Sequence, residues 1–409
     1  MIPGQRAEPA PLVLKFGGAA FTELAGYQRV AGHAARRLAE EDRPLVLVVS
    51  AMSGTTGRLQ QSLDAVAADP PARAAAMLLT TGETVSAALL AAALDAAGLP
   101  ARALSAAQTG LLAAGPADRA RLERVDAAVL RAALAGRRVL VVPGGQAVDV
   151  QGRTVMLGRN SSDLSAVAVA AALGAPVCEL FSDVPGVCTA DPYLVPAART
   201  LARIGYQGVR RMSRHGAKVI HESAVDWAEQ AGVRLHCRPF PWAARPGTGV
   251  DAGAGTLVGQ GPAAAAVVVH QGSEVWRFRS GERRLAAAEL LLADGLRTTE
   301  VDAASGRYLV VPGGARGAAR ALGAARRYGE LCLITTLGAD GGAEQVLVRR
   351  ADAAAEARRY HAALYPEPEP GSESEPAPGA VATVPLGPVK ARSAQSDVLL
   401  AADPRPRPA

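Results

Sequence analysis

Short apolar runs that end in glycine-rich or hydroxyl-rich turns recur in the first part of the chain. Residues 12–16 (LVLKF) lead into Gly17-Gly18, and residues 45–50 (LVLVVS) lead into a Ser/Gly/Thr segment, with an arginine-rich helical stretch between them. Near-continuous apolar runs of this length are typical of strands buried on both faces, as in parallel sheets. Strand, helix and strand in this order therefore predict an α/β domain.

The alternation of helical and strand-like segments continues downstream. The expected elements are a helix over 84–97, a helix near 117–135, a strand over 138–145, a hairpin turning at Gln151-Gly152, a buried helix after Asp163, a strand over 176–182 and a helical segment over 206–232. Repeated α and β elements predict a three-layer α/β/α domain. Polar residues recur at the strand ends, where open α/β sheets bind ligands.

Changes of composition divide the chain into domains. We expect a disordered N-terminus at 1–11, a first domain over 12–260 and a second, smaller α+β unit over 261–364, where apolar runs alternate with alanine-rich segments. From 365 to 409 the chain is rich in Pro, Glu and Ser. Such a composition buries too little apolar surface to fold alone, which predicts a disordered tail.

Charge, cysteine content and hydropathy disfavour several classes of protein. The net charge is +6, but the arginines are scattered among acids rather than clustered, which argues against nucleic-acid binding. The four cysteines form no CxxC pair, as expected in a reducing cytoplasm. The alanine-rich stretches are interrupted by polar residues, glycine or proline, and no apolar leader opens the chain. We therefore expect neither secretion nor a membrane span.

Phosphate-binding signatures of the common kinds are missing from the sequence. GxxxxGK[ST] does not occur, and no GxGxxG follows a strand. Short glycine turns instead stand at strand ends, at Gly17-Gly18, Gly54, Gly82, Gly144-Gly145, Gly158 and Gly186. Such turns let backbone N–H groups approach phosphates, although each alone is more often a plain tight turn.

Six segments in fixed order carry a family resemblance. They are LVLKFGG at 12–18, VVSAMSGTTGRL at 48–59, TTGE at 80–83, LGRNSSDLSAVAVAAAL at 157–173, SDVPGVCTADP at 182–192 and HGAKVIH at 215–221. Together they resemble the aspartate kinases within the amino-acid kinase family, and six ordered motifs are far more specific than one. The resemblance implies the three-layer amino-acid kinase fold with a C-terminal, degenerate ACT-like domain.

The resemblance also implies roles for individual side chains. Lys15 and Lys218 would flank the transferred phosphate, and Asp163 would organise these lysines. Arg159 would clamp the α-carboxylate of the substrate, because an arginine fork suits a bidentate carboxylate contact. Glu83 would receive the substrate ammonium. Taken singly, a lysine is more often a solvated surface charge, and an Arg/Asp pair four residues apart is more often structural.

The remaining predicted contacts involve hydroxyls, the nucleotide and a metal ion. The resemblance places Ser50 and Thr56 near substrate and phosphates, and assigns the nucleotide to Lys15, Gly17, Gly18, Ser182, Asp183, Gly186 and Lys218. ATP is expected with Mg²⁺, which sits on phosphates with few protein ligands, so no protein metal site is predicted. His215 and His221, six residues apart, do not share a helix face and are expected to be structural.

The chain departs from the family pattern at several positions near the expected site. Ala19-Ala20 stand where the family has Thr-Ser, Asn160-Ser161 replace two glycines, Cys188 replaces a tyrosine, and Tyr193 replaces an arginine. The expected site therefore has fewer hydrogen-bond donors and one cation fewer than the family pattern. This predicts slow turnover or a shifted acceptor pocket. The effector turn of the ACT modules is also missing, so the second unit is expected to serve dimer contacts rather than feedback by lysine or threonine.

These observations lead to one preferred function and two alternatives. We expect ATP-dependent phosphorylation of the side-chain carboxylate of L-aspartate or a close analogue, giving 4-phospho-L-aspartate and ADP. The carboxylate, with a pKa near 4, needs no general base at pH 7. The alternatives are a pseudokinase or regulatory subunit that keeps the fold, and a kinase of another small amino acid. A cytoplasmic homodimer is the expected assembly.

Overall fold

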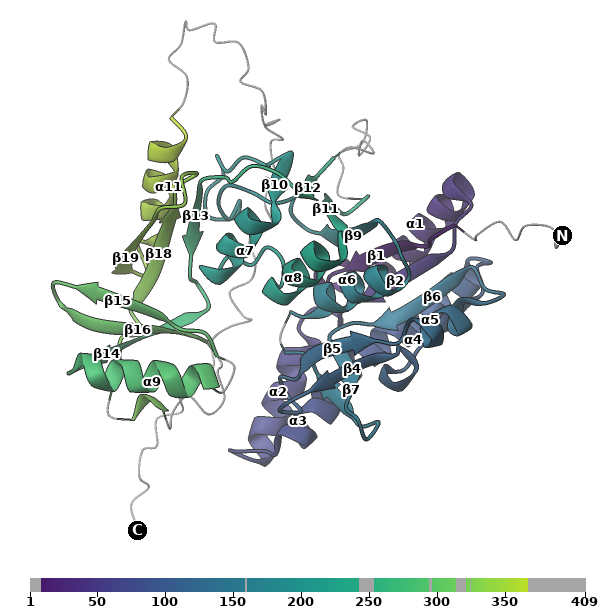
Figure 1. The fold of residues 1–409 in the computed structure, drawn as a ribbon, viewed down its shortest axis with the longest axis horizontal. Coiled ribbons are helices and arrows are strands. Elements are labelled where there is room, and N and C mark those ends of the chain that lie inside the picture. The colour runs from purple at the N-terminus through teal and green to yellow at the C-terminus, as the bar shows by residue number, and fades with distance from the viewer. Residues whose placement is uncertain are drawn as a thin grey trace, which may run out of the picture.

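A mixed eight-stranded sheet forms the centre of the first domain (Figure 1). The computed structural model describes residues 9–366 except 159, 243–253, 294–295, 314–320 and 324. In the order β10-β12-β11-β9-β1-β2-β6-β3, the strands are Arg203–Gly205, Thr256–Gly259, Arg234–Pro239, Val177–Ser182, Leu12–Phe16, Leu45–Val49, Val139–Pro143 and Ala101–Ala103. All neighbours pair in parallel except β11 and β12.

The helices of the first domain lie on the two faces of this sheet and beside the smaller sheet described below. They are α1 (Ala25–Glu41), α2 (Thr55–Val66), α3 (Ala72–Leu79), α4 (Thr81–Ala96), α5 (Ala127–Leu134), α6 (Ser162–Ala172), α7 (Tyr206–Arg214) and α8 (Glu222–Ala231), with short 3-10 turns at Gly18–Phe21 and Ala106–Gln108. Side chains of α1 and α4 pack on one face of β1, β2 and β6, and those of α6 and α8 pack on the other. The predicted three-layer arrangement is therefore confirmed.

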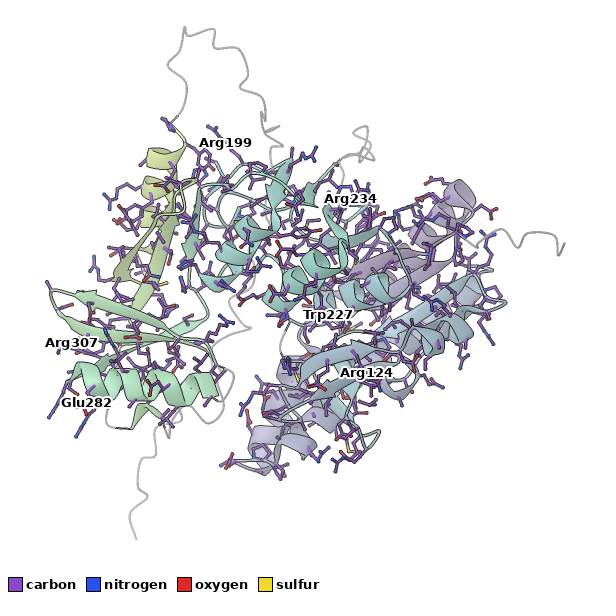
Figure 2. All side chains as sticks on the ribbon, viewed as in Figure 1. Arg124, Arg199, Trp227, Arg234, Glu282 and Arg307 are labelled. Atoms are coloured by element: carbon purple, nitrogen blue, oxygen red, sulfur yellow. The ribbon has the colours of Figure 1, made fainter. Side chains whose placement is uncertain are left out.

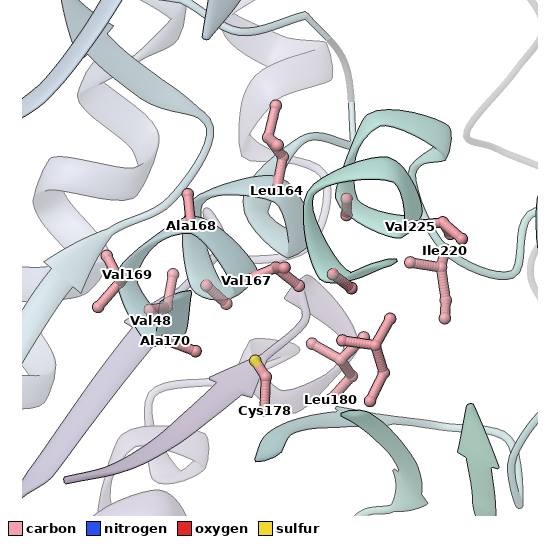
Figure 3. Close-up of a cluster of buried hydrophobic side chains, with 14 of the residues drawn as sticks. Val48, Leu164, Val167, Ala168, Val169, Ala170, Cys178, Leu180, Ile220 and Val225 are labelled. Atoms are coloured by element: carbon pink, nitrogen blue, oxygen red, sulfur yellow. The ribbon is translucent and has the colours of Figure 1, made fainter. Parts of the chain in front are cut away.

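Helix α6 is buried along almost its whole length because its side chains are small. Ala166, Val167, Ala168, Val169 and Ala170 are all fully buried. Figure 3 shows this helix between the sheet and α8, with Val48 and Cys178 of the sheet on one side and Val225 on the other. Small residues let the helix lie close to its neighbours, which fixes the position of its first turn at the strand ends.

A smaller four-stranded sheet flanks the first domain. Its order is β5-β4-β7-β8, with β5 at Arg121–Val125, β4 at Leu111–Ala114, β7 at Gln146–Val148 and β8 at Thr154–Met156. β7 and β8 form the hairpin predicted around Gln151-Gly152. The predicted helix near 117–135 is wrong in its first half, because β5 alternates buried Leu122 with exposed neighbours. The helix begins only after Asp126, whose carboxylate accepts a hydrogen bond from the Ala128 N–H at 3.0 Å.

The segment predicted as helical over 206–232 is two helices. α7 ends at Arg214 and α8 begins at Glu222. Gly216 has φ +87°, a left-handed conformation that glycine adopts without the strain a side chain would cause. The helical periodicity continues through the break, so it did not reveal the connection that carries Lys218.

The C-terminal unit contains two antiparallel sheets. One has the order β13-β18-β19 (Ala266–Val269, Leu331–Leu337, Ala343–Arg349), and the other has the order β15-β16-β14-β17 (Thr299–Ala303, Gly306–Pro312, Ser273–Phe278, Arg326–Arg327). α11 (Ala353–Leu364) packs on the first sheet and α9 (Gly281–Ala293) on the second. Val275 and Val310 of the second sheet meet Leu333 of the first. The order of the second sheet fits a ferredoxin-like βαββαβ unit.

Charged side chains are distributed over the whole surface. Figure 2 shows Arg124 on β5, Arg199 in a loop, Arg234 on β11 and Arg307 on β16 as separate features. By length and composition, one helical run among the described residues, Ala72–Ala96, could cross a membrane. Its second part, α4, packs against α1 and β6 in the core.

Tyr365 ties the end of α11 to the rest of the unit. Its hydroxyl donates to the Ala265 carbonyl at 2.8 Å, and Arg199 stacks on its ring. We expect a chain stopped after Leu364 to melt several degrees below a chain stopped after Pro366, because a buried hydrogen bond and a cation–π contact are each worth about 1 kcal/mol. Thermal melts of the two truncations test this, and equal melting temperatures would contradict it. The predicted disordered tail, 365–409, begins with Tyr365, which is ordered by these contacts, and residues 367–409 lie outside the described residues.

Candidate active site

An ion pair lies at the carboxyl end of the central strand. The Lys15 Nζ atom is 2.7 Å from Oδ1 of Asp163, and the two side chains are 14% and 12% exposed. Lys15 stands near the end of β1, between β2 and β9, and Asp163 stands in the first turn of α6. Oδ2 of Asp163 accepts a hydrogen bond from the backbone N–H of His221 at 3.4 Å. The predicted partners Lys15 and Asp163 are therefore brought together.

Of the two glycines after β1, only Gly18 makes an approach too close for a side chain. A Cβ on Gly17 would lie 3.4 Å from the Lys15 Nζ, and a Cβ on Gly18 would lie 2.9 Å from the Ala51 carbonyl oxygen. A side chain at Gly18 would displace the turn after β2, whereas one at Gly17 would only touch the ammonium. Gly18 thus allows the end of β1 to lie close to the turn after β2.

A cleft of about 700 Å³ opens beside this ion pair. Of the predicted site residues, Gly18, Ser50, Thr56, Glu83 and Lys218 line it. Ser50 Oγ donates to Ser162 Oγ at 3.0 Å, and Ser162 lies directly before Asp163. The cleft therefore collects residues from five sequence motifs around the ends of β1 and β2 and the start of α6.

A larger hollow lies elsewhere, on the C-terminal unit. It measures about 830 Å³ and is lined by residues that include Arg277, Arg279, Arg307 and Arg326. None of the predicted site residues borders it. We place the candidate active site in the smaller cleft because that cleft contains a partly buried carboxylate, hydroxyls and a lysine that come from separate sequence motifs.

Glu83 has an unusual environment within the cleft. It stands in the first turn of α4, and its Oε1 accepts a hydrogen bond from the Ala51 N–H at 3.3 Å. Burial raises the pKa of Glu83 to about 7, against 4.5 for an ordinary glutamate. A cation beside this carboxylate would stabilise its charged form, because a neighbouring ammonium lowers the pKa of a carboxyl group.

The predicted nucleotide turn follows β9, at the strand end next to that of β1. Asp183 accepts a hydrogen bond from the Tyr193 hydroxyl at 2.8 Å, and Ser182 caps the backbone N–H of Val184 at 3.4 Å. A Cβ on Gly186 would lie 2.6 Å from the Thr256 hydroxyl, so only glycine fits. This turn does not border the 700 Å³ cleft, but the Gly17 N–H donates to the Phe181 carbonyl and joins the two strand ends.

The comparisons with known proteins agree with this architecture. The family model described as "Amino acid kinase family" matches residues 10–239, more than half of the chain. The chain belongs to the amino acid kinase family. Its curated relatives include the aspartokinase of Thermus thermophilus, 41% identical over 239 residues, and that of Mycolicibacterium smegmatis, 38% identical over 243 residues. These alignments cover 58% of this chain in both cases, and 58% and 56% of the relatives.

Solved structures resemble a larger part of this amino acid kinase. Aspartokinase III of E. coli, in complex with aspartate and ADP, has a TM-score of 0.66 at 19% identity and covers 87% of this chain and 100% of its own. Aspartate kinase from Synechocystis has a TM-score of 0.52 at 25% identity, with 89% and 71% covered. The predicted amino-acid kinase fold is thereby confirmed.

Several positions where this kinase departs from the family pattern are buried. Ala20 is 1% exposed and Cys188 is 7% exposed, so both side chains belong to the packed interior. Ala19 is exposed, and Asn160 lines the cleft with φ +59°. Arg159 lies outside the described residues, and its predicted contact with the α-carboxylate stays a prediction.

Other residues of the cleft were not predicted from the sequence. Glu222 pairs with Arg214 at 2.6 Å and lies 3.7 Å from Arg297, and segment 270–273 forms another wall. Arg297 and segment 270–273 come from the C-terminal unit, where no motif indicated an active-site role. Among the described residues, no three His, Cys, Asp or Glu side chains cluster as metal ligands.

The Tyr193 contact gives a testable expectation for the nucleotide turn. Replacing Tyr193 by phenylalanine removes one donor to Asp183, and a hydrogen bond to a charged group is worth about 1.5–3 kcal/mol. We expect the KM for ATP to rise severalfold while kcat changes less than twofold, since the acceptor side of the cleft is untouched. Initial rates at varied ATP measure both constants. An unchanged KM would show that the turn does not orient the nucleotide.

Proposed function

We propose that this protein transfers the γ-phosphoryl group of ATP to the side-chain carboxylate of L-aspartate or a close analogue, releasing ADP and 4-phospho-L-aspartate. The Lys15–Asp163 ion pair beside a cleft that also holds Glu83 and Lys218 is the observation that carries the proposal. Relatives at 38–41% identity are aspartokinases, and one structural neighbour binds aspartate and ADP. The alignments span just over half of the length of those relatives. The proposal for the activity therefore rests on the geometry of the site rather than on the alignments.

The chemistry requires positioned positive charge rather than a base. A carboxylate oxygen of the acceptor attacks the γ-phosphorus, the bond to the bridging β,γ-oxygen breaks, and ADP leaves with the electron pair. Lys15 is held by Asp163, so its ammonium is fixed before the reaction begins. Lys218 supplies a second cation from another wall of the cleft. ATP enters as its Mg²⁺ complex, which screens the phosphate charge when bound.

The acceptor would be recognised as an α-amino acid. Glu83, with its raised pKa, would receive the ammonium, and Arg159 would receive the α-carboxylate. Ser50 and Thr56 line the same cleft and can donate to the reacting carboxylate or a phosphate oxygen. An acceptor without an ammonium group would leave the charge of the partly buried Glu83 without a cationic partner, which disfavours binding of that acceptor.

The domain organisation and assembly are part of the same proposal. We assign catalysis to residues 12–260 and an ACT-like role in homodimer contacts to residues 261–364, supported by the ferredoxin-like strand order β15-β16-β14-β17. Nucleic acid is not a proposed partner. A cytoplasmic location fits the four cysteines, which are all free and buried.

A panel of acceptors tests the proposal. ADP release would be measured with L-aspartate, D-aspartate, L-asparagine, L-glutamate and succinate in the presence of ATP and Mg²⁺. We expect turnover with L-aspartate and a strong preference over succinate, which lacks the ammonium that Glu83 would bind. If another amino acid were phosphorylated and L-aspartate were not, that amino acid would be the acceptor. Nucleotide binding without turnover on any acceptor would support a regulatory subunit.

A further inference from the structure

The C-terminal unit forms one wall of the candidate active-site cleft. The connection from β13 to β14, His270 to Gly272, and the first residue of β14, Ser273, border the cleft together with Lys218 and Gly216 of the first domain. The cleft is therefore built from both parts of the chain. A contact between these parts lies two residues from a proposed catalytic lysine.

His270 packs directly on the backbone of Gly216. A Cβ on Gly216 would lie 2.7 Å from Nδ1 and 3.0 Å from Cε1 of the imidazole, so the ring occupies the space that any side chain would need. The ring itself is fixed, because His270 is 6% exposed and its Nε2 is 3.0 Å from the hydroxyl of fully buried Thr335. The His270 N–H also donates to the Leu333 carbonyl at 2.9 Å. The imidazole is thus a rigid support for Gly216.

Further contacts hold the same connection against the C-terminal unit. Arg211, near the end of α7, donates to the Gly338 carbonyl at 2.6 Å and to the Gly342 carbonyl, both in the turn between β18 and β19. Gln345 Nε2 lies 3.4 Å from Nδ1 of His215. The end of α7 is therefore held by the turn between β18 and β19, and the connection to α8 has neighbours in the loop after β13 and in β19.

Arg350 holds segment 270–273 in place through hydrogen bonds to backbone carbonyls. The Arg350 guanidinium donates to the Gln271 carbonyl at 2.6 Å, the Ser273 carbonyl at 2.9 Å and the Leu331 carbonyl at 3.0 Å. The Gly313 N–H donates to the Gly272 carbonyl at 2.7 Å. Segment 270–273 consequently has little freedom to move away from Gly216.

We propose that His270 is a positioning residue for phosphoryl transfer, acting through Gly216 to set where the Lys218 ammonium stands in the cleft. This inference rests on the proposed function. Lys218 is exposed, and it forms no ion pair with the part of the chain that the structure describes, so its location depends on the backbone that carries it. The C-terminal unit then contributes to catalysis by contact, independently of any ligand it binds.

Kinetics of three variants test the positioning role. His270→Ala should lower kcat about tenfold with KM for the acceptor nearly unchanged, because a small misplacement of a charged group weakens transition-state stabilisation more than binding. His270→Phe, which keeps a flat ring against Gly216, should recover most of the loss. Arg326→Ala, on β17 of the same unit, is the control and should leave kcat unchanged. A His270→Ala enzyme with wild-type kcat would overturn the proposal.

A double-mutant cycle adds a direct measure of the contact. Gly216→Ala should also lower kcat, since its methyl group meets the ring. Combined with His270→Ala, it should cost clearly less than the product of the two single effects, because the methyl no longer meets the ring and only the backbone strain at φ +87° is left. Independent, multiplying effects would show that the two residues do not act through each other.

Hydrogen exchange separates failure of this inference from failure of the proposed function. Amides of 213–220 should exchange at least about tenfold faster in His270→Ala than in the wild type, while those of α1 should not change. This result does not depend on which acceptor is phosphorylated. Unchanged exchange at 213–220 would refute the contact even in an active kinase, and a wild type inactive on aspartate would refute only the function.

Discussion

Replacing Lys15 by methionine is expected to lower kcat roughly a hundred- to a thousandfold, the usual cost of removing one preorganised charge from a transition state. KM for ATP should rise much less, because the other nucleotide contacts remain. The variant should also be less stable by up to about 3 kcal/mol, since the Asp163 carboxylate, 12% exposed, loses its cation.

A double variant separates the two effects of the Lys15 substitution. Lys15→Met combined with Asp163→Asn removes both charges and should recover most of the lost melting temperature without recovering activity. Arg138→Met, which breaks the exposed pair of Arg138 with Asp42, is the matched control and should change neither property. If the double variant regained turnover, neither residue would belong to the catalytic site.

Replacing Glu83 by glutamine is expected to reduce kcat/KM for aspartate by about tenfold to a hundredfold, the cost of losing a charged hydrogen-bond partner for the ammonium. The wild-type kcat/KM should fall as the pH drops through about 7, because protonation of Glu83 removes the charge that binds the ammonium. In Glu83→Gln this dependence should disappear. A wild-type profile that is flat between pH 6 and 8 would contradict the assigned role.

The same pKa also predicts the pH dependence of stability. The folded state keeps a proton on Glu83 up to about pH 7, whereas the unfolded chain releases it near 4.5, so the contribution of Glu83 to stability falls as the pH rises between these values. Glu83→Gln should therefore melt higher than the wild type at pH 8 and about equally at pH 4.5. Glu40→Gln on the exposed face of α1 is the control.

The sequence predicted the central part of the fold because its strands are buried on both faces. β1, β2 and β6 are almost entirely apolar, and each ends at a glycine or serine turn. Their type and their bounds could therefore be predicted from the sequence. The exposed elements were harder to predict from the sequence. β5, with only Leu122 and the partly buried Val125 facing inward, looked helical in a charged context, and the break at Gly216 left the helical period intact.

The site could be predicted only where it follows strand ends. Lys15, Ser50 and Glu83 stand in short motifs beside strands or helix starts, and the fold brings them together around one cleft. His270 and Arg297 belong to segments far downstream of these motifs, and neither segment matches one of the six that carry the family resemblance. Their place in the cleft depends on how the C-terminal unit docks, which local sequence does not encode.

Trapping of the product tests the central claim most directly. The enzyme would be incubated with ATP, Mg²⁺, L-aspartate and hydroxylamine, and the adduct identified by mass spectrometry. We predict the β-hydroxamate of aspartate, formed in an amount equal to the ADP released and absent with Lys15→Met. ADP release without any hydroxamate, or a hydroxamate that persists undiminished in Lys15→Met, would contradict the proposed acyl-phosphate chemistry and its site.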